Sequence, residues 1–415
     1  MSWVVLISII LAVLSHRVRF DVAAFCGLLI FGLSGMVQPV LLFSGFASPA
    51  LFTIAVVLIM SQVVTDSGLF IGLGRAIQRR IFNPRIQLLV IFLTTAFMSA
   101  FMNNVGAVGL LIPTSKRMAE RVGAKESDFG LALAYAALLG GSATLIGTGS
   151  NLIVSSFRGQ ATGIPFRIFD FLPHGMAIIM VGVLFLFVCE ECGWILHSPF
   201  EKAAKEMDLS SLPPLPARDK RKVLWVIIPL IPAIWITAIG ILPPVLAFGT
   251  LIVLWGAAGV LDARKSYESL NLSVLVIVGC MMSVSTIMQS NGSFVALVEF
   301  LTPLLTLLPT LWTLFFIVLI TSALANVMDN AVAAVIVSPI MVQLHQAGSL
   351  AIPLDALLMA VAAGASLSIL IPTNKVTLVV QGEMGFTSSE FIHKGLAIAG
   401  FSSILATLVI WLVWS

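Results

Sequence analysis

The chain has 415 residues, of which 59% are apolar and only 10% are charged. Soluble globular domains carry about 25% charged residues, so this composition excludes an ordinary soluble enzyme, a nucleic-acid-binding protein and a disordered chain. The formal net charge of +3 gives no reason to expect a polyanionic partner. We therefore predict an all-α polytopic membrane protein with little mass outside the lipid bilayer.

Apolar runs follow one another along the chain, and most approach the roughly 20 residues that cross a bilayer as a helix. The first run, 3–15, has no basic residue before it, so we predict a membrane span there instead of a signal peptide. Further runs cover 20–38, 50–70, 86–113, 129–157, 172–190, 222–242, 244–261, 271–290, 311–344, 353–382 and 394–414. The charged, proline-containing stretch 191–221 is predicted to be a cytoplasmic linker between two halves, 1–190 and 222–415.

Two of these runs are too long for a single crossing, and each carries a polar pair in its middle. The run 86–113 would form a helix of about 42 Å, longer than a hydrocarbon core of about 30 Å, and it contains Asn103-Asn104. The run 311–344 contains Asp329-Asn330. A polar turn at membrane depth must lie within protein or line a water-filled cavity, so each run is predicted to be a re-entrant hairpin.

The distribution of basic residues supports this topology. If both hairpins enter and leave on one side, and the loop 16–19 is cytoplasmic, then 19 of the 22 Lys and Arg residues lie in cytoplasmic segments. Only Arg158 and Arg167 fall in outer loops, and Lys375 falls inside a span. This asymmetry satisfies the positive-inside rule and places both termini outside. We expect a multi-pass protein of the bacterial inner membrane.

The two halves of the chain resemble each other. The polar pairs Asn103-Asn104 and Asp329-Asn330 are 226 positions apart, and a proline follows each pair at the same interval. The first hairpin would open to the cytoplasm and the second to the outside. The halves are therefore predicted to contain inverted repeats, which in secondary transporters surround a binding site at mid-membrane; the second half would begin with a linking span.

Each hairpin is followed by an apolar run that helix-breaking residues interrupt. The run 129–157 contains the Gly- and Ser-rich stretch 140–151, and the run 353–382 contains the stretch 366–375 with Pro372. Interrupted helices expose backbone carbonyls that can bind a cation such as Na⁺, and helix N-termini that can bind an anion. Each half is therefore predicted to contain a broken transmembrane helix.

The sequence S-A-F-M-N-N from Ser99 and the stretch 140–151, G-G-S-A-T-L-I-G-T-G-S-N, resemble the divalent anion/sodium symporter family of the ion transporter superfamily. The resemblance covers nearly the whole chain. It implies a homodimeric, elevator-type transporter, in which a transport domain moves against a scaffold domain. It also implies sulfate or a di- or tricarboxylate as the substrate, usually with Na⁺. Both hairpin tips of this chain lack the threonine that the family carries there.

The resemblance, together with the polar hairpin tips and broken helices, implies the site residues. The residues predicted to bind the substrate are Asn103, Asn104, Val105, Thr148, Asn151, Asp329, Asn330, Thr373, Asn374 and Lys375. The residues predicted to bind Na⁺, in the first half only, are Ser99, Asn104, Thr144 and Gly147. No organic cofactor is expected.

The second half is expected to lack a Na⁺ site. Ala325 has no side-chain oxygen at the position equivalent to Ser99, and Lys375 introduces a positive charge. A charge at membrane depth is costly unless it is paired, so Lys375 is predicted to lie within about 4 Å of an Asp329 oxygen. Direct binding of the anion by Lys375 is left open.

We predict a secondary active transporter that imports a small anion with Na⁺, and we leave H⁺ open as a second coupling ion. The intramembrane Asp329 keeps a cation/proton antiporter or an arsenite-type permease as the alternative, and an anion channel is a further one. An enzyme is not expected, because the predicted spans contain no cluster of His, Cys and carboxylates and no activated serine. The expected partners are a small anion, the bilayer and a second copy of the chain, without nucleic acid.

Overall fold

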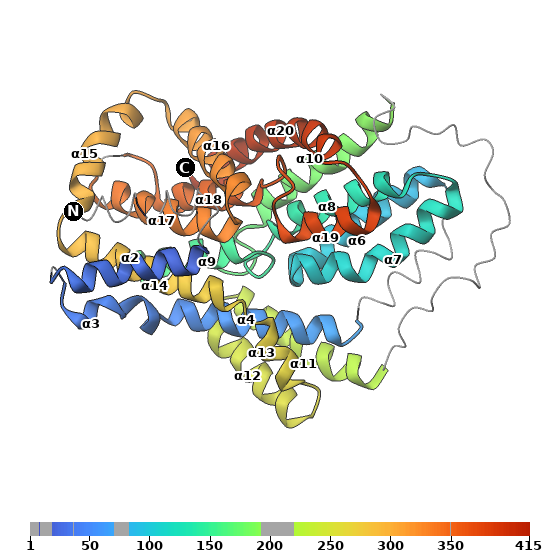
Figure 1. Cartoon of the computed structure of the whole chain (residues 1–415), viewed down its shortest axis with the longest axis horizontal. Helices are drawn as coiled ribbons and strands as arrows, with labels where there is room; N and C mark the ends of the chain where they lie inside the picture. The colour runs from blue at the N-terminus through green and yellow to red at the C-terminus, as the bar shows by residue number, and fades with distance from the viewer. Residues whose placement is uncertain (1–7, 9–18, 36, 70–82, 192–219, 349) are drawn as a thin grey trace.

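The computed structural model describes residues 8, 19–35, 37–69, 83–191, 220–348 and 350–415 (Figure 1). Every regular element of this part of the chain is a helix, which confirms the all-α prediction. Five of the described helices, α4, α11, α14, α16 and α20, are long and apolar enough to cross a membrane. Most of the predicted first span and most of the predicted linker lie outside the described residues.

One group of helices lies along the lower side of the molecule in Figure 1. Its members are α2 (Phe20–Leu33), α3 (Pro39–Leu42), a 3₁₀ turn (Ser44–Ala47), α4 (Pro49–Asp66), α11 (Lys220–Ala238), α12 (Pro244–Ala257), α13 (Ala263–Ser269) and α14 (Leu272–Ser290). Helix α14 packs against α2, α3 and the 3₁₀ turn, while α4 packs against α12 and α13. Helix α15 (Ser293–Thr306) contacts α14 and α17.

The remaining described helices form two sets of five. The first set is α6 (Pro84–Phe101), α7 (Asn104–Val122), α8 (Glu126–Gly141), α9 (Gly149–Thr162) and α10 (Leu172–Glu191). The second set is α16 (Thr310–Val327), α17 (Asn330–Gln346), α18 (Leu354–Ser366), α19 (Lys375–Met384) and α20 (Ser388–Trp414). Within the first set α6, α7 and α10 all pack against α8, and within the second set α16, α17 and α20 pack in the same way against α18.

Small residues allow the closest of these helix contacts. A Cβ atom on Gly140 of α8 would lie 2.3 Å from the Ala96 Cα atom of α6, and one on Gly364 of α18 would lie 2.5 Å from the Val318 carbonyl oxygen of α16. Helices that pack in a membrane approach closely where such small residues face each other. Glycine at these two positions therefore allows each broken helix to pack closely against the first helix of its hairpin.

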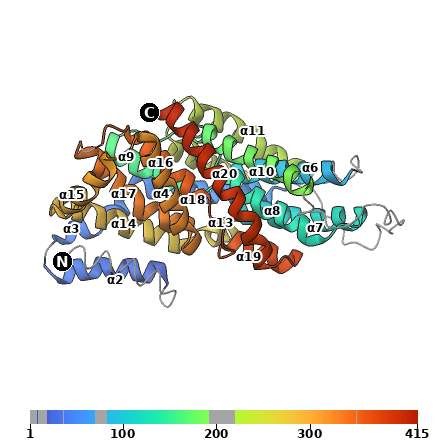
Figure 2. The ribbon, with the colours of Figure 1, turned by 90° about the horizontal axis from the view of Figure 1, so that it is seen from above.

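The second segment of each broken helix is exchanged between the two sets, because it packs against helices of the other set. Residues 142–148 separate α8 from α9, and residues 367–374 separate α18 from α19. Helix α9 packs against α17 and α18, whereas α19 packs against α7 and α8 (Figure 2). This exchange brings the hairpin turns and the broken helices of both halves to one place in the molecule.

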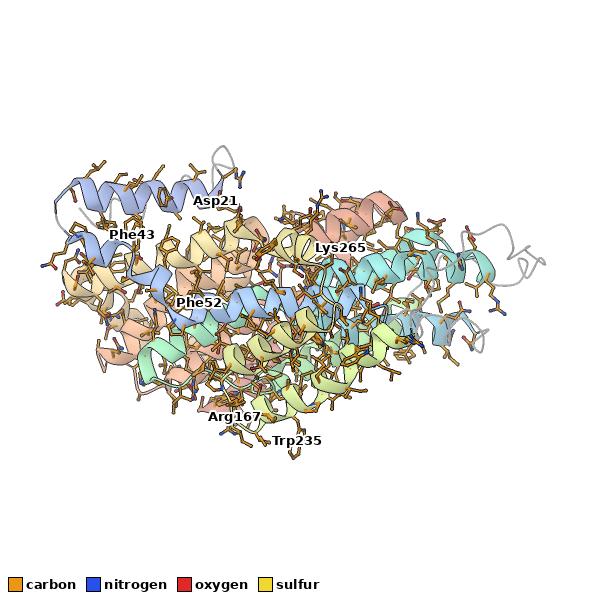
Figure 3. All side chains as sticks on the ribbon, turned by 90° about the horizontal axis from the view of Figure 1, so that it is seen from below. Asp21, Phe43, Phe52, Arg167, Trp235 and Lys265 are labelled. Carbon is orange, nitrogen blue, oxygen red and sulfur yellow. The ribbon has the colours of Figure 1, made fainter. Side chains whose placement is uncertain are left out.

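Large apolar side chains cover much of the outer surface. Phe52 of α4 is 59% exposed and Trp235 of α11 is 67% exposed, and both lie on the outside of the bundle (Figure 3). Phe401 of α20 is 66% exposed. Such a surface would aggregate in water, and it fits contact with the acyl chains of a membrane.

Candidate functional site

A cavity of about 550 Å³ lies where the two sets of helices meet the lower group. Part of its wall comes from α4 and from residues 268–274, which include the end of α13 and the start of α14. The rest comes from the two hairpin turns and the starts of α9 and α19. The predicted substrate residues that line this cavity are Asn103, Asn104, Val105, Thr148, Asp329, Asn330, Asn374 and Lys375. The predicted residues Asn151 and Thr373 do not line it; both lie in or beside the interrupted segments.

Four of the described helices begin at this cavity. Their N-cap residues are Asn103 for α7, Thr148 for α9, Asp329 for α17 and Asn374 for α19. Each cap side chain accepts a hydrogen bond from a backbone amide of the first turn, at distances from 2.9 to 3.4 Å. The amides of a first helical turn have no partner within the helix, and the N-terminus carries a partial positive charge. The arrangement can therefore hold an anion.

Lys375, Asp329 and Glu268 carry the formal charges among the residues that line the cavity, and Glu268 pairs with Arg264 of α13 at 3.0 Å. Lys375 is exposed, and Asp329 accepts a hydrogen bond from the Ala331 amide at 2.9 Å. Among the ion pairs of the described residues none joins Lys375 to Asp329, so the predicted contact within about 4 Å is wrong for this conformation. The physical reason is that the two residues start different helices, and the carboxylate caps its own helix.

A second cavity, of about 380 Å³, shares Lys375 and Asp329 with the first. It extends to Arg19 and Asp21 at the start of α2. Arg19 and Asp21 pair with each other at 2.9 Å, and Ser273 of α14 donates to Asp21 at 2.8 Å. The charges at the start of α2 are therefore already engaged, which leaves Lys375 as the cationic side chain that the structure places in both cavities.

The predicted cation ligands Ser99 and Asn104 are in direct contact. The Ser99 hydroxyl oxygen lies 2.6 Å from Asn104 Oδ1 and 2.6 Å from the carbonyl oxygen of Ala137. With the Asn104 carboxamide in this orientation, a hydroxyl with a single proton faces two acceptors. A Cβ atom on Gly141 would lie 2.9 Å from Asn104 Oδ1, so the broken helix reaches the same point. The Ser99 hydroxyl oxygen, Asn104 Oδ1 and the Ala137 carbonyl oxygen therefore lie close together, with one hydroxyl proton to share.

The other predicted cation ligands lie in the interrupted segment of the first half. The Thr144 hydroxyl donates to the Ala100 carbonyl, and the Thr144 carbonyl accepts from Asn151 Nδ2 at 2.8 Å. Asn151 is fully buried, and its Oδ1 has no hydrogen-bond partner among the described residues. A Cβ atom on Gly147 would lie 2.3 Å from the Gly141 carbonyl oxygen, so glycine is required there. Buried oxygens without a donor are the groups that bind a cation.

Two contributors to the site were missed in the sequence. Ser61 of α4 accepts a hydrogen bond from the Asn103 amide at 2.7 Å, and this bond holds the tip of the first hairpin against α4. Asn326 of α16 is 2% exposed and bonds to the interrupted segment of the second half. Single polar residues within apolar runs are common in helix packing, so their positions in the sequence gave no specific signal.

Apolar helices around a polar cavity, with hairpin turns and broken-helix ends in its wall, are typical of a membrane transport protein. Residues 5–364 match a family model described as citrate transporter. This match covers most of the chain, so the chain belongs to the citrate transporter family, within the ion transporter superfamily. The resemblance predicted from the hairpin and broken-helix motifs is thereby confirmed.

Relatives by sequence are transporters as well. An uncharacterized transporter of Escherichia coli, YfbS, is 31% identical over 173 residues, which are 41% of this chain and 28% of that protein. An uncharacterized transporter of Methanocaldococcus jannaschii, MJ0672, is 26% identical over 77% of this chain and 72% of that protein. Sodium/sulfate cotransporter 1 of Chlamydomonas reinhardtii is 25% identical over 40% of this chain and 20% of that protein. The chain thus spans only about a quarter of the length of the Escherichia coli and Chlamydomonas relatives.

The fold also has a solved counterpart. The crystal structure of the Alcanivorax borkumensis YdaH transporter aligns with a TM-score of 0.66 and covers 91% of this chain and 88% of that chain. The sequence identity is 15%, so the alignment shows a shared fold. The chain therefore shares its fold with a solved membrane transporter, in agreement with its family match.

Proposed function

We propose that this protein is a secondary active transporter that imports a small anion of the sulfate or di- and tricarboxylate class together with Na⁺. The observation that carries this proposal is the start of four helices at one cavity that also contains Lys375. The helix N-termini and the ammonium group offer positive charge and backbone donors to an anion. The cavity volume of about 550 Å³ suits a small anion that keeps part of its water shell.

The Na⁺ ion would bind in the first half, beside the anion. The oxygens that fit this ion are Ser99 Oγ, Asn104 Oδ1 and the carbonyls of the neighbouring broken helix, because they outnumber the available protons. Oxygen ligands suit a hard cation, and carbonyls of interrupted helices are a common source of them in transporters. Since Asn104 also lines the cavity, cation and anion would support each other's binding.

The movement would take place between the two groups of helices. We infer that α6–α10 and α16–α20 form the transport domain, built from inverted repeats, and that the lower group forms the scaffold of a homodimer. The cavity is lined by both groups, so an elevator-like displacement would change its exposure. The charge distribution supports an orientation with both termini outside, and the location that we propose is the bacterial inner membrane.

Uptake into liposomes tests this proposal. Purified protein is reconstituted, and uptake of radiolabelled sulfate, succinate and citrate is measured with a Na⁺ gradient and with choline in place of Na⁺. We expect Na⁺-stimulated uptake of at least one anion, and Lys375→Ala should weaken it about tenfold or more, because a charge-assisted contact contributes about 1.5–3 kcal/mol. The matched control is Lys265→Ala on α13, an exposed lysine outside the cavity lining, which should keep full uptake. Absence of uptake for all anions would contradict the proposal.

A cation/proton antiporter is the second candidate, because the Asp329 carboxylate lines the cavity. A carboxylate at membrane depth can carry a proton through a transport cycle. Liposomes with a pH gradient and no added anion separate the two functions. Exchange of Na⁺ for H⁺ under these conditions, abolished by Asp329→Asn, would favour the antiporter.

A further inference from the structure

The two broken helices differ in how their polar backbone groups are satisfied. The first half gathers more oxygens than protons around Ser99, as described above. We propose that in the second half the carboxamide of Asn326 permanently occupies the equivalent position, so that each protomer binds a single Na⁺. This inference rests on the proposed function, because it concerns the number of coupling ions.

Asn326 and Ala100 occupy equivalent positions in the two halves. They are 226 residues apart, as are the polar pairs of the hairpin tips, and each lies in the last turn of the first hairpin helix. The Ala100 carbonyl accepts a hydrogen bond from the Thr144 hydroxyl, and the Asn326 carbonyl accepts one from the Thr373 hydroxyl at 3.1 Å. Both threonines belong to the interrupted segments, so the two hairpins hold their broken helices by the same bond.

The side chains at these positions are different. Where the first half has Ser99 followed by the small Ala100, the second half has Ala325 followed by Asn326. The Nδ2 atom of Asn326 donates to the carbonyl oxygens of Ser322 at 2.8 Å and Leu367 at 3.0 Å. A cation would bind to such carbonyls, and here an N–H₂ group already covers them.

The carboxamide oxygen of Asn326 completes the substitution. It accepts hydrogen bonds from the backbone amides of Leu370 at 2.7 Å and Ile371 at 3.2 Å. A carboxamide has two donor protons and one acceptor oxygen with two lone pairs, and all four interactions are made. A buried network that is fully satisfied is rigid. The interrupted segment 367–374 therefore keeps its shape without an ion.

This proposal gives Asn326, and not Lys375, the role of replacing the second cation. The lysine was expected to take the place of the second cation, but Lys375 is exposed and lines the cavity, while Asn326 is buried against the broken helix. Lys375 is then available to the anion. Asn326 is a positioning residue, since it acts through the segment 367–374 and does not line the cavity.

The number of bound cations tests the inference directly. Binding of ²²Na⁺ to the purified full-length protein is measured at equilibrium for the wild type and for Ser99→Ala. We expect a single ion per protomer in the wild type and none in Ser99→Ala. Two ions in the wild type, with one retained in Ser99→Ala, would overturn the role of Asn326 and leave Na⁺ coupling intact.

A second variant is designed to create the Na⁺ site that the second half of the wild type lacks. Asn326→Asp replaces the N–H₂ group by a carboxylate oxygen beside the Ser322 and Leu367 carbonyls, so it should gain a cation. We expect two ions per protomer and a rise of the Hill coefficient for Na⁺ from about 1 to about 2. The control is Asn83→Asp, at the exposed N-cap of α6, which should keep one ion. A folded Asn326→Asp protein that gains no ion would refute the assignment.

The outcomes also separate this inference from the proposed function. If the wild type binds no Na⁺, the proposed Na⁺ coupling fails, whereas a gain of one ion in Asn326→Asp would still support the role of Asn326. If Asn326→Asp does not fold, the ion counts of the wild type and Ser99→Ala decide the question alone.

Discussion

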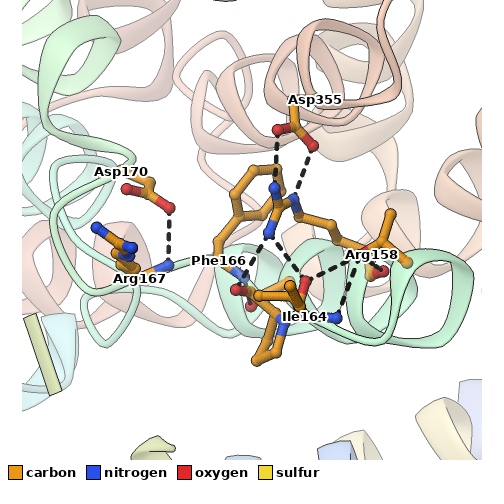
Figure 4. Close-up of polar contacts among 9 residues, drawn as sticks. Arg158, Ile164, Phe166, Arg167, Asp170 and Asp355 are labelled. Carbon is orange, nitrogen blue, oxygen red and sulfur yellow. Dashed lines mark hydrogen bonds and ion pairs between the residues drawn. The ribbon is translucent and has the colours of Figure 1, made fainter. Parts of the chain in front are cut away.

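Arg158 of α9 and Asp355 of α18 form a bidentate ion pair, with Nε–Oδ1 and Nη2–Oδ2 distances of 2.7 and 2.9 Å (Figure 4). Arg158 also donates to the Ile164 carbonyl at 2.9 Å, and its guanidinium lies 4.6 Å from the centre of the Phe166 ring. Because α9 belongs to the first half of the chain and α18 to the second, this pair joins the two halves. This ion pair therefore helps to hold α9 against the second set of helices.

Breaking this pair should lower stability. The side chains are 20% and 25% exposed, so water screens the interaction only in part. We expect Arg158→Gln and Asp355→Asn each to lower the free energy of unfolding by about 1–2 kcal/mol, with a coupling energy of about 1 kcal/mol in the double-mutant cycle. The stability of the wild type, the two single variants and the double variant is measured by thermal unfolding in detergent. Strictly additive losses would contradict a direct contribution of the pair.

Neutralising Asp329 should strengthen anion binding. Asparagine caps a helix as well as aspartate does, so Asp329→Asn should keep the start of α17 and the stability of the protein. It removes a negative charge from the cavity, and relief of repulsion of about 1 kcal/mol corresponds to a roughly fivefold lower KM for the anion. Uptake at several anion concentrations measures this change. Asn103→Asp, at the equivalent cap of α7, should have the opposite effect, and an unchanged KM in both variants would contradict the model.

Gly395 of α20 should not tolerate a side chain. A Cβ atom there would lie 2.0 Å from the carbonyl oxygen of Ile369, which belongs to the interrupted segment 367–374. Gly395→Ala should displace this segment and lower the melting temperature, at a cost of about 1–3 kcal/mol typical of overpacking. Gly400→Ala in the same helix is the control, because no atom lies within 4 Å of its Cβ position. That control should gain up to about 1 kcal/mol through helix propensity, and a similar gain for Gly395→Ala would refute the close contact.

Asp170 should make stability depend on pH. It lies in the turn between α9 and α10, outside the apolar runs, where burial raises its pKa, although a hydrogen bond from the Arg167 amide acts in the opposite direction. Because the pKa is higher in the folded than in the unfolded protein, the stability that the protonated group contributes is present below the unfolded pKa. It is lost as the pH rises through the folded pKa. From about pH 4 to about pH 7, the melting temperature of the wild type should therefore fall relative to that of Asp170→Asn.

The control for Asp170 is Glu120→Gln on α7, measured over the same pH range. A constant difference in melting temperature between the wild type and Asp170→Asn at every pH would show that burial of Asp170 does not affect its titration.

The sequence by itself determined the all-helical class and the membrane location, because both depend on composition and on the length of apolar runs. It also indicated that the two helices of each hairpin meet at a polar pair, Asn103-Asn104 in the first half and Asp329-Asn330 in the second. Helix breaks and caps are local events, decided by residues a few positions apart, so they can be inferred from the order of residues along the chain.

Only the tertiary structure decided which of these breaks meet. The exchange of α9 and α19 brings four helix starts to one cavity, and it results from packing between segments far apart in the chain. The Asn326 carboxamide bonds to amides 44 and 45 residues away, and no local pattern indicates such partners. The same holds for Lys375 and Asp329. Their charges suggested an ion pair, but helix packing places the first residue of α19 beyond ion-pair distance of the residue that caps α17.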